Sequence, residues 1–336
     1  MSASERSESL SSRPDRLLSR YAACIVWLAR YMERIENLAR ILDVTETFAR
    51  DDRDARNWLS IVQINADEKR FFAKYPQATA EAISRFYVLD RDNPTSIAAA
   101  IACAHENART VRPLISTEMW SQINVFYNWV RQLGESDIAP WRISSLCAAL
   151  KESCQLHSGI TEGTFFRDQG WSFYAMGKYL ERADQITRLV DIKYHTLLPS
   201  VQAVGSALDV SQWNALLRAG AGYHAFRRVC PRGMTPTAVV GFLLLNNSFP
   251  RSLVLCVQQV EWYLTQLRVR YGLRGGTRAL EHFDALRSAL IDQSIEQIIG
   301  SGLHEFLDWV QQQLNRVYAE IAGAFWETPQ EQSQQQ

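Results

Sequence analysis

Two segments of this sequence carry the same arrangement of carboxylate and guanidinium groups. They are ARYMERIENLARILDV (29–44), which contains Glu33 and Arg34, and GKYLERADQITRLVDI (177–192), which contains Glu181 and Arg182, at a constant offset of 148 residues. Such groups can form a buried network of ion pairs, or line a cleft that binds a carboxylate, phosphate or amide. The two segments are therefore the candidate functional centre.

The correspondence extends well beyond the Glu-Arg dipeptide. Tyr31, Arg40 and Asp43 return as the same residue types, and Arg30, Glu36 and Asn37 return as Lys, Asp and Gln. Any two amphipathic helices share apolar positions, but shared charged and amide positions need a cause. We predict an internal duplication of a long helix that carries the Glu-Arg motif. The candidate binding residues are Arg30, Glu33, Arg34, Asn37, Arg40, Lys178, Glu181, Arg182, Gln185 and Arg188.

Three arrangements of these residues stay open. The turns before each motif, YAACIVWLA (21–29) and QGWSFYAMG (169–177), carry no charge, which is typical of a buried helix. Glu33 and Glu181 would then belong to a buried charge network or to a polar cleft that binds a ligand. The third arrangement is a solvated face with pairs at i,i+3 and i,i+4. A pseudo-twofold axis between the two helices would place each Glu opposite the Arg of the other copy, or both at one cleft.

Several kinds of chemistry find no support in the sequence. Di-iron bundles use Glu-x-x-His pairs, and no histidine here follows a Glu by three residues. A carboxylate acting as general acid needs a raised pKa, whereas adjacent arginines hold it ionised. Neither a nucleotide-binding loop nor a nucleophile elbow occurs. We predict no metal and no cofactor, and the sequence favours a non-catalytic role.

Helical periodicity dominates the chain and predicts an all-α multi-helix bundle. Leu28, Tyr31, Ile35, Leu38 and Leu42 step by three and four, and no strand pattern occurs. The expected helices are 16–50, 54–66, 78–88, 94–109 with Asn93 as N-cap, 114–133, 141–166, 170–198, 211–228, 236–246, 251–271, 278–291 and 303–326.

One helical domain is expected over 15–326, with a possible lobe boundary near 199–210. The polar ends 1–14 and 327–336 are expected to be a disordered arm and tail. Lys plus Arg and Asp plus Glu both number 36, so no net field would attract nucleic acid or an anionic membrane. The six cysteines form no CxxC pair, which favours reduced thiols in the cytoplasm.

Two further segments carry candidate polar groups. Glu106, Asn107 and Arg109 in HENART (105–110) weakly repeat the ENLAR pattern and would add polar groups to the same core. Arg227 and Arg228 in FRRVCPRG (226–233) form a basic turn suited to a carboxylate or phosphate. The alternative for both segments is an ordinary solvated surface.

The longest motifs resemble those of the bacterial alpha-E family, wholly helical domains of unknown function named for a Glu-Arg motif. The resemblance is carried by LARYMERIENLARIL (28–42), GKYLERADQITRLVD (177–191), LDRDNPTSI (89–97), HENARTVRPLISTEMW (105–120), WNALLRAGAGYHAFRR (213–228) and TPTAVVGFLLLNNSFPRSL (235–253).

The resemblance implies partners more than a reaction. Alpha-E proteins are associated with circularly permuted ATP-grasp amide ligases and with transglutaminase-like peptidases. The implied role is an accessory, substrate-presenting subunit acting in trans, since this chain contains no ATP-grasp domain. The alternatives are an enzyme of the same pathway that uses the Glu-Arg cleft for acyl or amide transfer, and a purely structural scaffold. The oligomeric state stays open.

Overall fold

The computed structural model describes residues 17, 19–49, 55–197, 207–231, 233–273 and 275–326, and these contain helices without strands. The expected arm 1–14, the tail 327–336 and most of the segment 199–210 lie outside the described residues. The helices are α1 (Ser19–Ala49), α2 (Ala55–Ile64), α3 (Glu68–Phe72), α4 (Ala80–Ser84), a π-helical turn η2 (Arg85–Leu89), α5 (Ile97–Thr110), α6 (Thr117–Arg131), a 3₁₀ turn η3 (Glu135–Asp137), α7 (Ile143–Thr164), α8 (Gln169–Leu197), α9 (Ala207–Ala219), α10 (Tyr223–Val229), α11 (Pro236–Leu245), α12 (Leu253–Tyr271), α13 (Thr277–Ile291) and α14 (Ile295–Phe325). The all-α fold class predicted from the sequence is confirmed.

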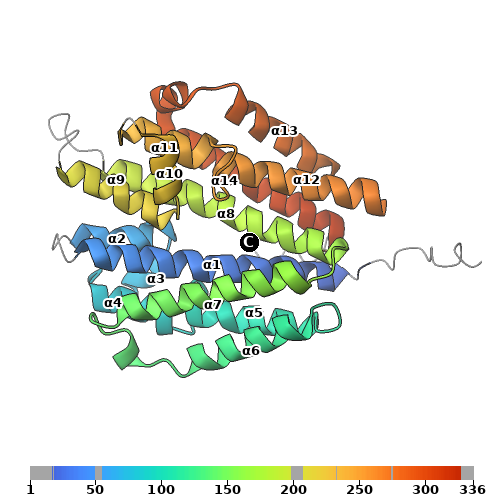
Figure 1. Cartoon of the computed structure of the whole chain (residues 1–336), viewed down its shortest axis with the longest axis horizontal. Helices are drawn as coiled ribbons and strands as arrows, with labels where there is room; N and C mark the ends of the chain where they lie inside the picture. Colours follow the sequence, from blue (N-terminus) through green and yellow to red (C-terminus); the bar gives the residue numbers. More distant parts are fainter. Residues whose placement is uncertain are drawn as a thin grey trace, which may run out of the picture.

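The two long helices α1 and α8 lie side by side in the middle of the molecule (Figure 1). They are parallel, because Val26 meets Gly177 near their starts and Glu33 meets Arg182 further along both. Gly177 permits this close approach, since a Cβ added there would overlap the backbone carbonyl of Val26. The apolar stripe of α1, including Leu28, is buried.

The two halves of the chain, α1–α7 and α8–α14, repeat a series of local features. Ala66 before α3 and Ala221 before α10 both have positive φ, 52° and 58°. Thr79 caps α4 and Thr235 caps α11, each accepting a hydrogen bond from the backbone N–H three residues later. The Phe71–Phe86 and Phe226–Phe242 ring pairs are both edge-to-face.

The turn before α5 is also repeated before α12. Ser96 and Ser252 are the N-caps, and their hydroxyls also donate to the carbonyls of Asp90 and Asn246, at 2.5 and 2.6 Å. These correspondences pair α1–α7 with α8–α14 in order. The duplication predicted from two helices therefore has structural counterparts along both halves, and their common ancestry stays a prediction.

The halves are interlocked across the central pair. Helix α2 packs on α8, and α9 packs on α1, so each short helix covers the central helix of the other half. Helices α5 and α7 cover α1, while α12 and α14 cover α8. In Figure 1 the first half forms the lower layer and the second half the upper layer, with α1 and α8 between them.

Three expected boundaries differ from the structure. Asn93 is not the N-cap of α5: its buried amide donates to the carbonyl of Phe86, and Ser96 caps the helix instead. The helix expected over 211–228 is broken between α9 and α10, where Ala221 takes a left-handed conformation. Helix α14 begins at Ile295, eight residues before its expected start, and is kinked at Gly302, where φ is 114°.

Candidate functional site

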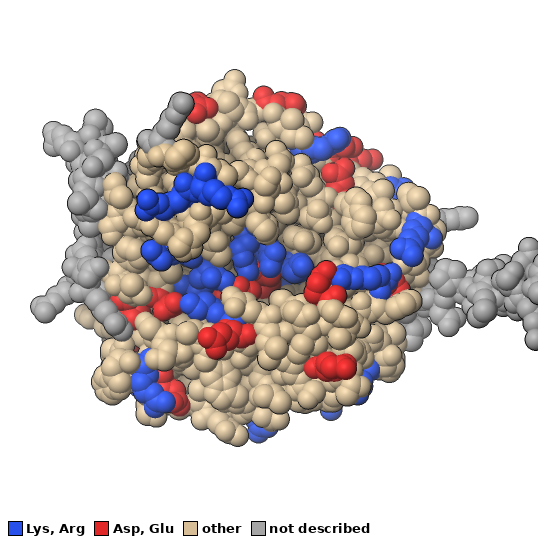
Figure 2. Space-filling model, viewed as in Figure 1, with Lys and Arg blue, Asp and Glu red and all other residues tan. Residues whose placement is uncertain are grey.

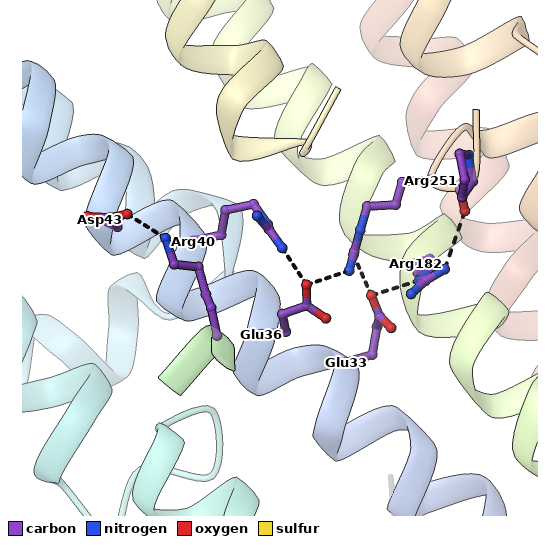
Figure 3. Close-up of polar contacts among 8 residues, drawn as sticks. Glu33, Glu36, Arg40, Asp43, Arg182 and Arg251 are labelled. Carbon is purple, nitrogen blue, oxygen red and sulfur yellow. Dashed lines mark hydrogen bonds and ion pairs between the residues drawn. The ribbon is translucent and has the colours of Figure 1, made fainter. Parts of the chain in front are cut away.

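Glu33 and Arg182 form the centre of what we call the first cluster, with Glu36, Arg40 and Arg251 (Figure 3). Lys178, whose charge interacts with Glu33 and Arg182, is its sixth member. Arg182 Nε lies 2.8 Å from Glu33 Oε1, and Arg251 also donates to that oxygen. Arg251 reaches Glu36 as well, at 2.9 Å, and Arg40 donates to Glu36 from one turn away. Two carboxylates of α1 are thus held by guanidiniums from three parts of the fold.

The second cluster reverses these roles and consists of Arg30, Arg34, Glu181, Asp184, Gln185 and Arg188. Arg34 binds Glu181 through two nitrogens, at 2.7 and 3.1 Å, and Arg30 donates to the same carboxylate at 2.8 Å. Gln185 completes the shell at 3.0 Å. In the first cluster α1 supplies the Glu and α8 the Arg, whereas in the second cluster α8 supplies the Glu and α1 the Arg. Because the two helices are parallel, the clusters lie on opposite sides of the contact between α1 and α8.

Both central carboxylates are buried, with Glu33 4% and Glu181 2% exposed. Burial alone would raise their pKa values, but Arg182 and Arg251 outweigh it at Glu33 and hold its pKa at about 2. Arg34 and Arg30 do the same for Glu181, whose pKa is also about 2. The solvated-face arrangement is therefore wrong for both residues. Both carboxylates are ionised near neutral pH, so neither is poised to act as a general acid there.

The clusters continue into ion pairs that link each central helix to its own half. Asp43 accepts from Lys151 of α7 at 2.6 Å, and the matching Asp191 pairs with His304 of α14 at 2.9 Å. In the second cluster, Arg30 also lies over two aromatic rings, 4.7 Å from the Trp27 centroid and 4.9 Å from that of Tyr318. These contacts tie α1 to α7 and α14, and α8 to α14.

The first cluster carries more positive than negative charge. Arg40, Lys178, Arg182 and Arg251 face two carboxylates, Glu33 and Glu36. The side chains of Arg40, Arg182 and Arg251 are 14–15% exposed, whereas Glu36 is 8% exposed. Figure 2 shows basic groups gathered in the middle of one face, along the seam between the two layers, with acidic groups among them.

The structure brings together most of the residues singled out in the two motif helices. Asn37 is the exception, because its half-buried amide has no hydrogen bond to another described residue. Sequence reasoning left Arg251, Glu36 and Asp184 out of the candidate set. Glu36 and Asp184 could have been found from the sequence, since they match in charge at the offset of 148 residues. Arg251 had none, because Thr95 stands at the corresponding place before α5.

The secondary candidates lie on the surface. Glu106 and Arg109 pair with each other at 2.5 Å with 58% and 67% of their side chains exposed, so the expectation that they join the polar core is wrong. Asn107 is half-buried on the same helix. Arg227 and Arg228 are exposed on α10, where Arg227 donates to the Tyr223 hydroxyl at 3.1 Å.

Fold and site together define an all-helical protein with two exchanged Glu-Arg clusters at its centre. Within the described ranges, no group of three His, Cys, Asp or Glu side chains is arranged to bind a metal. None of the described helices combines the length and the apolar character needed to cross a bilayer.

The family model that matches residues 17–326 is alpha-E, described as a predicted alpha-helical domain with a conserved ER motif. The chain belongs to the alpha-E family, and within the matched residues Glu-Arg dipeptides occur at 33–34 and 181–182. Similar curated proteins are an uncharacterized protein of Mycobacterium bovis, 24% identical over 308 residues, and uncharacterized proteins of two Mycobacterium tuberculosis strains, 24% and 23% identical. The matches cover 83% of this chain but 33% of each relative, so the chain spans about a third of their length. No solved structure matches the chain.

Proposed function

We propose that this protein is a helical accessory subunit that presents an anionic or amidic substrate, in trans, to a circularly permuted ATP-grasp amide ligase. A transglutaminase-like peptidase would act later on the product in the same pathway. The observation that carries the proposal is the state of the two central carboxylates, which arginines hold ionised and in place. Groups of this kind bind and position, and they do not move protons.

The charge balance supports a binding role. A surplus of guanidinium and ammonium groups in the first cluster suits a carboxylate, which arginines recognise through paired hydrogen bonds. The exposed Arg227 and Arg228 offer a second basic surface on α10. Arg34 contributes less to ligand binding than the motif implies, because its Nε and Nη2 both donate to Glu181.

The lengths of the relatives support a role beside other domains. Two thirds of each mycobacterial relative lies outside the part that this chain covers. A domain that works next to others in one polypeptide can serve as a separate subunit elsewhere. The proposal places the protein in the cytoplasm, where ATP is available and where its six free thiols stay reduced.

Reconstitution tests the proposal. The ATP-grasp ligase of the same organism is purified, and its peptide-dependent ATP turnover is measured with and without this chain. We expect the chain to co-purify with the ligase and to raise turnover at low peptide concentration. Arg227→Ala/Arg228→Ala tests the basic turn, with Lys74→Met, a surface pair to Asp90, as control. Unchanged turnover and no co-purification would contradict the proposal, and product formation without the ligase would favour the enzyme alternative.

A further inference from the structure

Lys178 is a cation of the first cluster that has no acceptor. It has neither a hydrogen bond nor an ion pair with any residue in the described part of the chain, and its ammonium lies 4.8 Å from the centroid of the Tyr179 ring. The charged groups around it are Arg182, Arg251, Glu33 and Glu162. Two of these are guanidiniums and two are carboxylates.

The two nearby carboxylates are engaged elsewhere. Glu33 is bound by Arg182 and Arg251. Glu162 is 63% exposed and pairs with Arg167 at 2.7 Å. Burial and the neighbouring Arg182 lower the pKa of Lys178. Lys178 is half-buried, and an ammonium that makes no ion pair within the protein stays available to bind an anion.

The second cluster shows how the same position looks when it is satisfied internally. Arg30 corresponds to Lys178, and its Nε donates to Glu181 at 2.8 Å while two aromatic rings cover the guanidinium. Thr95 in the first half corresponds to Arg251 in the second, and its hydroxyl binds Asn93 and Asp67. The first cluster therefore has an additional cation, Arg251, and a cation that is left open.

In the first cluster the arginine side chains are more exposed to solvent than the carboxylates. The guanidiniums of Arg40, Arg182 and Arg251 are partly exposed, and the carboxylates lie beneath them. An anion that enters the seam would meet donors before it meets a carboxylate.

We propose that the first cluster is a binding site for an oxyanion, in which Lys178 is the free cation and Arg182 and Arg251 contribute partly exposed guanidiniums. The ligand is a carboxylate or phosphate group of a small molecule or peptide. In the second cluster the matching cation, Arg30, already has an acceptor within the protein. The identification of the ligand as the carboxylate of a peptide substrate rests on the proposed function. The anion-binding site itself does not rest on it.

Anion binding to the isolated full chain tests the site. The probes are inorganic phosphate, acetate and a short peptide that ends in glutamate, each followed by isothermal calorimetry and by the rise in melting temperature with probe concentration. The variants are Lys178→Met, which keeps the stem and removes the charge, Lys178→Arg, and Arg251→Thr, which installs the residue found at the matching place. Arg30→Met in the second cluster is the matched control.

We expect Lys178→Met to weaken binding of the preferred probe by tenfold or more, Arg251→Thr to do the same, and Lys178→Arg to stay within a few fold of wild type. Arg30→Met should bind as wild type does, even if its melting temperature falls. Without anion, Lys178→Met should melt at or above the wild-type temperature, because the ammonium makes no hydrogen bond or ion pair in the described part of the chain.

The arms separate the sources of the ligand. Tighter binding of the peptide than of acetate or phosphate would support a peptide carboxylate, and tighter binding of phosphate would support a phosphoryl group at the same site. The site is wrong if wild type binds none of the probes at millimolar concentration, or if Lys178→Met binds as wild type does. Loss of the ligase interaction alone would leave this result unaffected, because no ligase is present.

Discussion

Replacing Glu181 by Gln is the sharpest test of the buried charge network. This carboxylate binds two guanidiniums, Arg34 through two hydrogen bonds and Arg30 through one, at 2.7–3.1 Å. Gln has nearly the same shape and keeps one acceptor oxygen, but it removes the charge. Two cations would then remain in a site where the original side chain is 2% exposed.

The magnitude follows from the pKa of the carboxylate. Its value of about 2 lies well below the ordinary 4.5, so the folded protein favours the ionised form strongly. At about 1.4 kcal/mol for each pKa unit, that preference amounts to roughly 3 kcal/mol. Breaking a buried pair from one side costs about 3–5 kcal/mol. We expect Glu181→Gln to lower the free energy of unfolding by an amount in this range.

Urea unfolding at pH 7, followed by circular dichroism and tryptophan fluorescence, measures the change. Coincident transitions are needed for a two-state value. The control is Glu106→Gln, which removes a carboxylate that is 58% exposed and should change stability by less than about 0.5 kcal/mol. If Glu181→Gln were as stable as this control, the charges would be solvated and the network interpretation would be refuted.

Three further outcomes are expected. Gly177→Ala should destabilise the protein by about 1–3 kcal/mol, because the new Cβ overlaps the Val26 carbonyl. Gly159→Ala in α7 is the control, and it should stabilise the protein by roughly 0.5–1 kcal/mol because the space around Gly159 is open. Equal effects of the two substitutions in urea unfolding would contradict the close packing of α1 and α8. Stability contributed by Glu33 and Glu181 should be complete above pH 4.5 and be lost as the pH falls towards 2, since both pKa values are lowered in the folded state; a flat acid limb in a pH series of urea midpoints would count against it. The exposed Cys103 should react first with a thiol reagent, and Cys147 and Cys256, whose pKa values burial raises to about 12, should react only on unfolding; mass spectrometry of early labelling checks the order.

The sequence predicted the part of the site that depends on periodicity and on the repeat. Polar positions that match at a fixed offset led to Glu33, Arg34, Glu181 and Arg182, because two equivalent helices in contact exchange their partners. The uncharged turns before each motif indicated burial. These inferences need only the local chain and the pitch of a helix.

The missing parts depend on contacts between distant segments. Arg251 lies 218 residues from Glu33 and has no matching arginine in the first half, so no pattern pointed to it. The N-cap of α5 was misplaced because Asn93 uses its side chain for a tertiary bond to Phe86, which local cap preferences do not reveal. The break before α10 was missed because apolar periodicity continues across Ala221, whose positive φ of 58° ends the helical path.

The parallel pairing of α1 with α8 has a consequence for the order of events during synthesis. Arg30 and Arg34 leave the ribosome well before their carboxylate, Glu181, which is about 150 residues further along the chain. The nascent first half therefore exposes unpaired guanidiniums and the face of α1 that α8 later covers. Both are covered only when α8 of the second half packs against α1.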